Sequence, residues 1–165
     1  MDKKITAPYP TKLIEFINKW NDHSPTITVN TSGSTGEPKP WTVEKDKMKA
    51  SALSTIKFFN LQPKERVLLC LPIDYIAGVM MVVRSIIADL ELVSVTPSSH
   101  PLGSIDEPIH FAAMTPMQVF NSLQDPIECE RLKKIKNLLL EEEQLHQLFP
   151  VHSNHSQMKF IRPME

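Results

Sequence analysis

Two stretches of the chain carry apolar residues at the three- and four-residue spacing of an amphipathic helix. The residues on these two faces are Leu13, Phe16, Ile17 and Trp20, and then Met48, Ala52, Ile56 and Phe59. Pro10 suits the first turn of the first helix, and Pro63 lies where the second helix should already have ended. We therefore expect one helix on each of these faces.

Beyond residue 65, short continuous apolar runs alternate with further helical patterns. Strands are expected at 66–72, 91–95, 109–113 and the end of 131–140, and helices at 76–90 and 115–123. The first run, Arg-Val-Leu-Leu-Cys-Leu-Pro, is almost wholly apolar, as in strands that are covered on both faces. This alternation predicts an α/β fold, with a layered, largely parallel sheet flanked by helices.

Residues 26–31 alternate β-branched side chains and predict a strand that runs into a loop. The loop, Thr-Ser-Gly-Ser-Thr-Gly-Glu-Pro-Lys over 31–39, holds two of the four glycines of the chain. Pro38 and Pro40 prevent a helix from following at once, which separates this loop from Rossmann and Walker loops. A proline also follows Lys39 where a Walker loop has the Ser or Thr that binds magnesium. Residues 41–43 are expected to form a short strand.

This loop has the chemistry of a phosphate site. Backbone N–H groups and short hydroxyls bind phosphate oxygens when the backbone can approach closely, and glycine permits that approach. The candidate phosphate-binding residues are Thr31, Ser32, Gly33, Ser34, Thr35, Gly36 and Lys39. A surface turn rich in serine, threonine and glycine is the alternative interpretation of the same residues.

The ungapped string from Thr31 to Lys39 resembles the phosphate-binding signature of the acyl-adenylate-forming (AMP-binding) superfamily. That superfamily includes acyl-CoA synthetases, luciferases and the adenylation domains of peptide synthetases. The resemblance implies an enzyme that uses ATP to convert a carboxylic acid into an acyl-adenylate and then transfers the acyl group to coenzyme A. ATP with Mg²⁺ and coenzyme A are the implied co-substrates, and the loop would hold the β- and γ-phosphates.

A second stretch resembles one branch of this superfamily, the o-succinylbenzoate–CoA ligases of menaquinone biosynthesis. Residues 71–78 match a Leu-Pro-x-x-(aromatic or His)-x-x-Gly pattern, and an arginine follows at position 84 as in those ligases. Residues 111–123 are similar to their next strand and helix. By this resemblance the small-molecule acid would be o-succinylbenzoate. The residues that would line the acyl-substrate pocket are Tyr75, Gly78, Arg84 and Thr115.

Two of these pocket residues have structural alternatives. Asp74-Tyr75 replaces the usual aromatic-His pair, so Tyr75 either lines the pocket or is a partly buried structural tyrosine. Arg84 lies in an apolar helix, where an unpaired charge is costly. It either grips the free carboxylate of a dicarboxylic substrate or takes part in a structural ion pair.

Composition and charge argue against several classes of function. Hydrophobic residues make up 41% and the formal net charge is -1, so no charge excess points to nucleic acid or an anionic membrane. No apolar run reaches the roughly 18 residues of a spanning helix, and the N-terminus lacks the apolar core of a signal peptide. Cys70 and Cys129 show no pattern, which favours a reducing cytoplasm. The histidines, including His152 and His155, show no metal-site spacing.

The resemblance covers roughly residues 9–140, within the 1–140 that we expect to form an N-terminal nucleotide- and acyl-binding subdomain. An irregular tail is expected over 141–165. The adenine-seating turn, a Tyr-Gly-x-Thr-Glu segment and a C-terminal domain with a catalytic lysine have no counterpart, so no catalytic residue is assigned. The sequence is then a fragment, a natural truncation, or a longer protein whose loops are left out here.

Two functions are open at this point. The first is an ATP-dependent acid–CoA ligase, specifically an o-succinylbenzoate–CoA ligase, of which the 165-residue chain alone is inactive. The second is a catalytically inactive module of the same fold that binds a nucleotide or a partner. Tight binding of a stable acyl-adenylate analogue would favour the first, because such binding needs both halves of the site.

Overall fold

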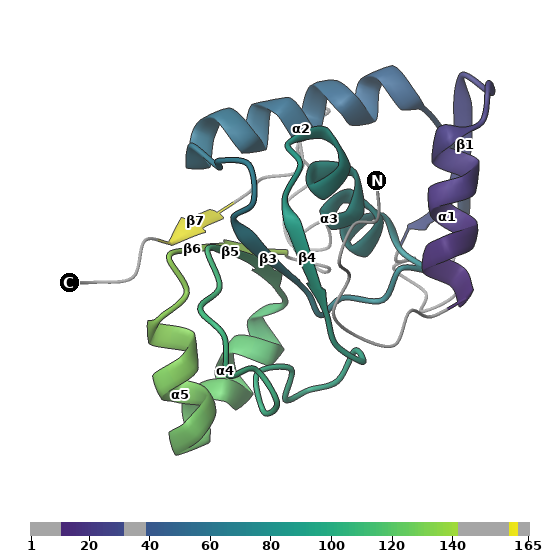
Figure 1. Cartoon of the computed structure of the whole chain (residues 1–165). Coiled ribbons are helices and arrows are strands. Elements are labelled where there is room, and N and C mark those ends of the chain that lie inside the picture. Colours follow the sequence, from purple (N-terminus) through teal and green to yellow (C-terminus); the bar gives the residue numbers. More distant parts are fainter. Residues whose placement is uncertain (1–10, 32–38, 142–158, 162–165) are drawn as a thin grey trace.

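A five-stranded sheet forms the centre of the structure, with strands in the order β4-β3-β5-β6-β7 (Figure 1). The computed structural model describes residues 11–31, 39–141 and 159–161. The strands are β3 (Arg66–Leu69), β4 (Glu91–Ser94), β5 (Phe111–Met114), β6 (Asn137–Leu140) and β7 (Lys159–Ile161). The first four are parallel to one another, and β7 pairs antiparallel with β6. The predicted largely parallel sheet is confirmed.

Helices cover both faces of this sheet. Successive side chains of a strand point to opposite faces, and here the side chains on both faces are apolar, so both faces have to be covered. Val67 and Leu69 of β3 join one apolar core, whereas Leu68 and the following Cys70 join the other. The first core packs against α1 (Thr11–Asn21), α2 (Lys45–Phe59) and α3 (Ile76–Ile87). The helices on the second face are α4 (Pro116–Gln124) and α5 (Pro126–Lys133). The alternation of strands and helices in the sequence therefore becomes a three-layer α/β/α arrangement.

A separate two-stranded ribbon, β1 (Thr26–Thr31) and β2 (Lys39–Glu44), lies outside the main sheet. Its strands are antiparallel, from the pair Thr26 and Glu44 to the pair Thr31 and Lys39. Lys45 fixes one end of the ribbon: its buried ammonium donates to the carbonyl of Lys19 at 2.7 Å and to the carboxylate of Asp22 at 2.7 Å. The ribbon is thus attached to the C-terminal end of α1.

The structure departs from the expected elements at their boundaries and in one strand. β2 spans six residues rather than the three of Trp-Thr-Val, because its backbone pairs with the whole of β1. The helix predicted to end at residue 90 ends at Ile87, and Asp89 takes a left-handed backbone conformation with φ 52°. β7 lies within the segment 141–165, for which no regular element was expected. The rest of that tail, residues 142–158 and 162–165, lies outside the described residues.

Both cysteines are free thiols, in agreement with the unpatterned cysteine usage. Burial raises the pKa of the Cys70 thiol to about 12, and its Sγ lies 3.4 Å from the carbonyl oxygen of Ala113. Cys70 is therefore a small buried hydrophobe and not a nucleophile. Within the described part of the chain, no helix has the length and hydropathy needed to cross a membrane.

Candidate functional site

The strand order places a topological switch point at the carboxyl ends of β3 and β5. These two parallel strands are neighbours, yet the helix after β3 packs on one face of the sheet and the helix after β5 on the other. In open α/β sheets, ligands bind where the connections of adjacent strands diverge in this way. The residues that follow the two strands here are Cys70–Pro72 and Thr115.

The open end of the β1–β2 ribbon lies at the same edge. Asn30 forms an isolated parallel bridge with Tyr75, which immediately precedes α3. Thr31 and Lys39 face each other one residue further along the ribbon, so the loop that joins them starts and ends beside the carboxyl end of β3. Ser32, Gly33, Ser34, Thr35 and Gly36 lie outside the described residues, and their phosphate-binding role stays a prediction.

Gly78 is where α3 approaches the turn after β3. A Cβ at this position would lie 2.3 Å from the carbonyl oxygen of Pro72 and 3.0 Å from that of Leu71. Only glycine fits at that distance, because both neighbours are backbone atoms. Tyr75, which is half-buried, lies between Pro72 and Gly78 along the chain and donates its backbone N–H to the Pro72 carbonyl at 3.2 Å. Gly78 thus has a packing role, and its place in an acyl pocket stays a prediction.

Thr115 forms the N-cap of α4, as part of a reciprocal capping box. Its hydroxyl accepts the backbone N–H of Gln118 at 3.2 Å, and the Gln118 side-chain oxygen accepts the N–H of Thr115 at 3.0 Å. The Gln118 amide nitrogen donates to the carbonyls of Cys70 at 3.2 Å and Ser98 at 2.9 Å. One buried side chain therefore joins the segments that follow β3, β4 and β5. The sequence analysis missed Gln118, although the Thr-Pro-Met-Gln spacing of a capping box was available as a signal.

Replacing Gln118 by Ala is expected to lower the free energy of unfolding by about 1.5 kcal/mol, because the buried Cys70 carbonyl and the partly buried Ser98 carbonyl lose their donor and α4 loses half of its cap. Urea denaturation followed by circular dichroism measures this change. Gln124→Ala, at the exposed end of the same helix, is the matched control and should change stability by less than about 0.5 kcal/mol. Equal effects of the two substitutions would show that the Gln118 contacts do not stabilise this edge.

Arg84 lies apart from the other predicted pocket residues. It is two turns beyond Gly78 on α3 and only 1% exposed, with its guanidinium carbon 5.9 Å from the ring centroid of Phe111. Its Nη1 contacts the sulfur of Met81 at 3.4 Å, and its Nε is buried without a hydrogen-bond partner within the described structure. Burial lowers the pKa of this guanidinium to about 10, an effect that the carboxylate of Glu141 opposes. Among the described residues, no close ion pair of Arg84 is found. Its role in acid binding stays a prediction.

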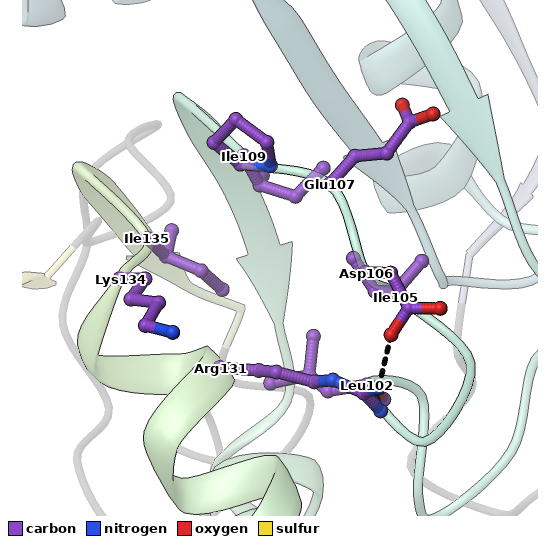
Figure 2. Close-up of a pocket in the computed structure, with 9 residues that line it drawn as sticks. Leu102, Ile105, Asp106, Glu107, Ile109, Arg131, Lys134 and Ile135 are labelled. Atoms are coloured by element: carbon purple, nitrogen blue, oxygen red, sulfur yellow. Dashed lines mark hydrogen bonds and ion pairs between the residues drawn. The ribbon is translucent and has the colours of Figure 1, made fainter.

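Two hollows flank the sheet at opposite edges. One of about 130 Å³ lies at the carboxyl ends of β3 and β4, between Leu13, Leu71 and Val95. The larger, of about 350 Å³, lies at the amino ends of β5 and β6 (Figure 2). There Arg131 donates to the carbonyls of Leu102 and Gly103 and pairs with Asp106, so it braces the loop before β5. Because ligands of open α/β sheets bind at the carboxyl edge, we assign the candidate site there despite the larger hollow at the amino edge.

The described residues contain no grouping of His, Cys, Asp and Glu that could hold a metal ion. No protein-family model matches the sequence, and no curated protein matches it either. Solved structures do match it. A Dyadobacter fermentans protein, described as similar to AMP-forming acyl-CoA synthetase/AMP-acid ligase II, is 37% identical with a TM-score of 0.76. The match covers 84% of this chain and 40% of that one.

Two more distant structures share the fold. ATP-bound MatB from Rhodopseudomonas palustris is 16% identical with a TM-score of 0.55, over 68% of this chain and 23% of that one. A double mutant of o-succinylbenzoate CoA synthetase from Bacillus subtilis, bound with the product analogue OSB-NCoA, is 21% identical with a TM-score of 0.53. That match covers 68% of this chain and 24% of the synthetase.

The chain therefore has the α/β fold of the N-terminal domain of AMP-forming acyl-CoA synthetases. The Dyadobacter protein, at 37% identity, supports the superfamily that the Thr31–Lys39 loop predicts. This chain spans 40% of the length of that protein.

Proposed function

We propose that this chain is the ATP-phosphate-binding part of an ATP-dependent acid–CoA ligase. The observation that carries the proposal is the loop between Thr31 and Lys39, whose two ends are paired at the carboxyl edge of a parallel sheet with the acyl-CoA synthetase fold. The fold neighbour MatB was solved with ATP bound, which supports ATP as the nucleotide.

In such a ligase an oxygen of the acid attacks the α-phosphorus of ATP, and the bond to the bridging oxygen breaks to release pyrophosphate. The thiolate of coenzyme A then attacks the acyl carbon, and AMP leaves. Negative charge grows on the departing β- and γ-phosphates, so fixed donors at that position stabilise the transition state. Here the hydroxyls and backbone N–H groups of residues 31–36 and the ammonium of Lys39 would supply that stabilisation. Mg²⁺ enters with ATP as part of the substrate.

For the acid we propose a small carboxylic acid, o-succinylbenzoate, bound beside Tyr75, Gly78 and Thr115. Tyr75 immediately precedes α3, Gly78 lies in the first turn of that helix, and Thr115 follows the neighbouring strand β5. The proposal of this acid is supported by the likeness to the o-succinylbenzoate CoA synthetase fold. Arg84 lies apart from these three residues, and its contact with the second carboxylate is proposed from the sequence resemblance alone. The two free cysteines support a reducing compartment, the cytoplasm.

The second candidate is a catalytically inactive module that binds a nucleotide or a partner. One observation favours it: Asp74-Tyr75 stands where the ligases that residues 71–78 resemble have an aromatic-His pair. A nucleotide-binding module of this fold would bind MgATP as a ligase does, but only a complete ligase exchanges pyrophosphate into ATP when the acid is present.

Isothermal titration calorimetry with MgATP tests the proposal directly. We expect the 165-residue chain to bind MgATP and Lys39→Ala to weaken that binding about tenfold, because one cation next to the phosphates is lost. Lys47→Ala, on the exposed face of α2, is the matched control and should leave the affinity unchanged. Absence of MgATP binding, or equal effects of the two substitutions, would contradict the assignment of the loop.

A further inference from the structure

The larger hollow, at the amino ends of β5 and β6, lies at the edge of the sheet opposite the candidate site (Figure 2). We call it the amino-edge hollow. Its volume of about 350 Å³ falls within the range of small-molecule sites. Four apolar side chains, each at most 7% exposed and part of the second core, form its floor: Leu102, Ile105, Ile109 and Ile135. Because these side chains are packed on their inner sides, the floor is formed before any ligand arrives.

Four charged side chains line the same hollow, and three of them are already paired. Arg131 pairs with Asp106, so these two charges cancel. Glu107 pairs with Arg66 at 3.3 Å, and its carboxylate points away from the hollow (Figure 2). The fourth side chain, Lys134, points into the hollow from the end of α5 (Figure 2). Among the described residues, its ammonium has no ion pair or hydrogen bond.

The amino-edge hollow therefore holds one uncompensated positive charge above an apolar floor. Glu130, on the same helix, attracts Lys134 through space but is itself paired with Lys133 at 2.8 Å. A single net positive charge complements a monoanion better than a phosphate dianion. A carboxylate accepts charge-assisted hydrogen bonds from an ammonium, and the packed floor favours an apolar body behind that carboxylate.

We propose that the amino-edge hollow is a second ligand site, which binds a small apolar monocarboxylate. Its carboxylate contacts Lys134, and its hydrocarbon body covers the apolar floor. Arg131 fixes the wall of this site, because it donates to the carbonyl of Leu102 at 2.9 Å and to that of Gly103 at 2.6 Å. A wall fixed in this way lowers the cost of ordering the site on binding. The proposal does not rest on the proposed function, which uses the carboxyl edge of the sheet.

Titration of the 165-residue chain with octanoate, followed by ¹H–¹⁵N NMR, tests the proposal. We expect a Kd of about 1 mM, the affinity typical of a ligand with roughly ten heavy atoms. Lys134→Gln should weaken binding about tenfold, because the carboxylate loses its cation. Lys133→Gln is the matched control: this lysine precedes Lys134, is exposed and pairs with Glu130, so its replacement should leave the Kd unchanged. Octanamide, the neutral analogue, should bind about tenfold more weakly than octanoate.

The amides that shift on titration locate the ligand. We expect the shifts within residues 102–109 and 131–136, the segments that surround the amino-edge hollow. Shifts confined to the turn at residues 71–78 and to Thr115 would overturn the proposal, because octanoate would then occupy the proposed acyl pocket. It would also fail if octanoate did not bind at about 10 mM, if the two lysine substitutions had equal effects, or if octanamide bound as tightly as octanoate. Failure of MgATP binding, in contrast, would count only against the proposed function.

Discussion

Replacing Gly78 by Ala is expected to lower the free energy of unfolding by about 3 kcal/mol and the Tm by roughly 10 °C. The added methyl carbon would lie 2.3 Å from the Pro72 carbonyl oxygen and 2.7 Å from its carbon, well inside van der Waals contact. Neither atom can move without displacing the turn that joins β3 to α3. The helix propensity of alanine returns about 1 kcal/mol, which is too little to offset the clash.

The same substitution should weaken MgATP binding. The displaced turn contains Tyr75, whose backbone bridges to Asn30 at the end of the strand that leads into the Thr31–Lys39 loop. Calorimetric titration of the folded variant with MgATP measures this second effect. A variant that loses stability but keeps full MgATP affinity would show that the turn does not position the loop.

Gly103→Ala is the matched control. Its Cβ would lie 3.2 Å from a carboxylate oxygen of Glu128 and 3.7 Å from the His100 carbonyl oxygen, so only the end of a side chain has to shift. We expect its stability to stay within about 1 kcal/mol of the parent chain. Differential scanning calorimetry of the two variants under identical conditions gives the comparison. A Gly103→Ala variant as unstable as Gly78→Ala would show that any added methyl group is tolerated poorly in this chain.

The hydrophobic pattern predicted the elements of the main sheet because both of its faces are covered. The run of residues 67–70, in β3 and directly after it, has to be apolar at every position, and that run is visible without a structure. β7 was not predicted because three residues are too few to show a period. The length of β2 was underpredicted for a different reason. Lys39, Pro40 and Glu44 extend the strand through backbone pairing with β1, and all three are exposed, so they carry no apolar alternation.

The candidate site was predicted by motif more than by geometry. Tyr75 and Thr115 do lie at the carboxyl ends of neighbouring strands, but the sequence could not show that the Thr115 hydroxyl is used as a helix cap. Gly78 matches the motif because a backbone carbonyl occupies the space of its side chain. The capping role of Gln118 could have been predicted from the Thr-Pro-Met-Gln spacing, but its contacts with Cys70 and Ser98, 48 and 20 residues away along the chain, could not. Contacts of that range depend on the tertiary fold and leave no local pattern.

Arg84→Met is expected to raise the free energy of unfolding by about 2 kcal/mol at pH 7. The guanidinium is 1% exposed and its Nε has no partner within the described structure. The Phe111 ring, at about 1 kcal/mol, and the attraction of the Glu141 carboxylate offset only part of the lost hydration. Methionine fills the same space beside Met81 without a charge to desolvate. A buried, poorly paired charge that lowers stability is characteristic of a functional position. In a complete ligase, the Arg84→Met variant should therefore lose the exchange of pyrophosphate into ATP that depends on the carboxylic acid.

The pH dependence of this gain has a definite sign. Because burial lowers the folded-state pKa of Arg84 to about 10 from 12.5, the penalty for its charge is fully present below about pH 10. Between about pH 10 and 12.5 the folded state releases the proton first, so the penalty is relieved and the advantage of Arg84→Met should narrow. Urea denaturation at pH 7, 9 and 10.5 measures the difference between variant and parent chain.

Arg131→Met is the matched control, because this arginine donates to the carbonyls of Leu102 and Gly103 and pairs with Asp106. Its replacement leaves the loop before β5 without its brace and is expected to lower the free energy of unfolding by about 2 kcal/mol. The same chemical change should therefore act in opposite directions at the two sites. Destabilisation by Arg84→Met of the same size as by Arg131→Met would show that Arg84 is a satisfied structural charge, and the case for a buried cation kept for a substrate carboxylate would fail with it.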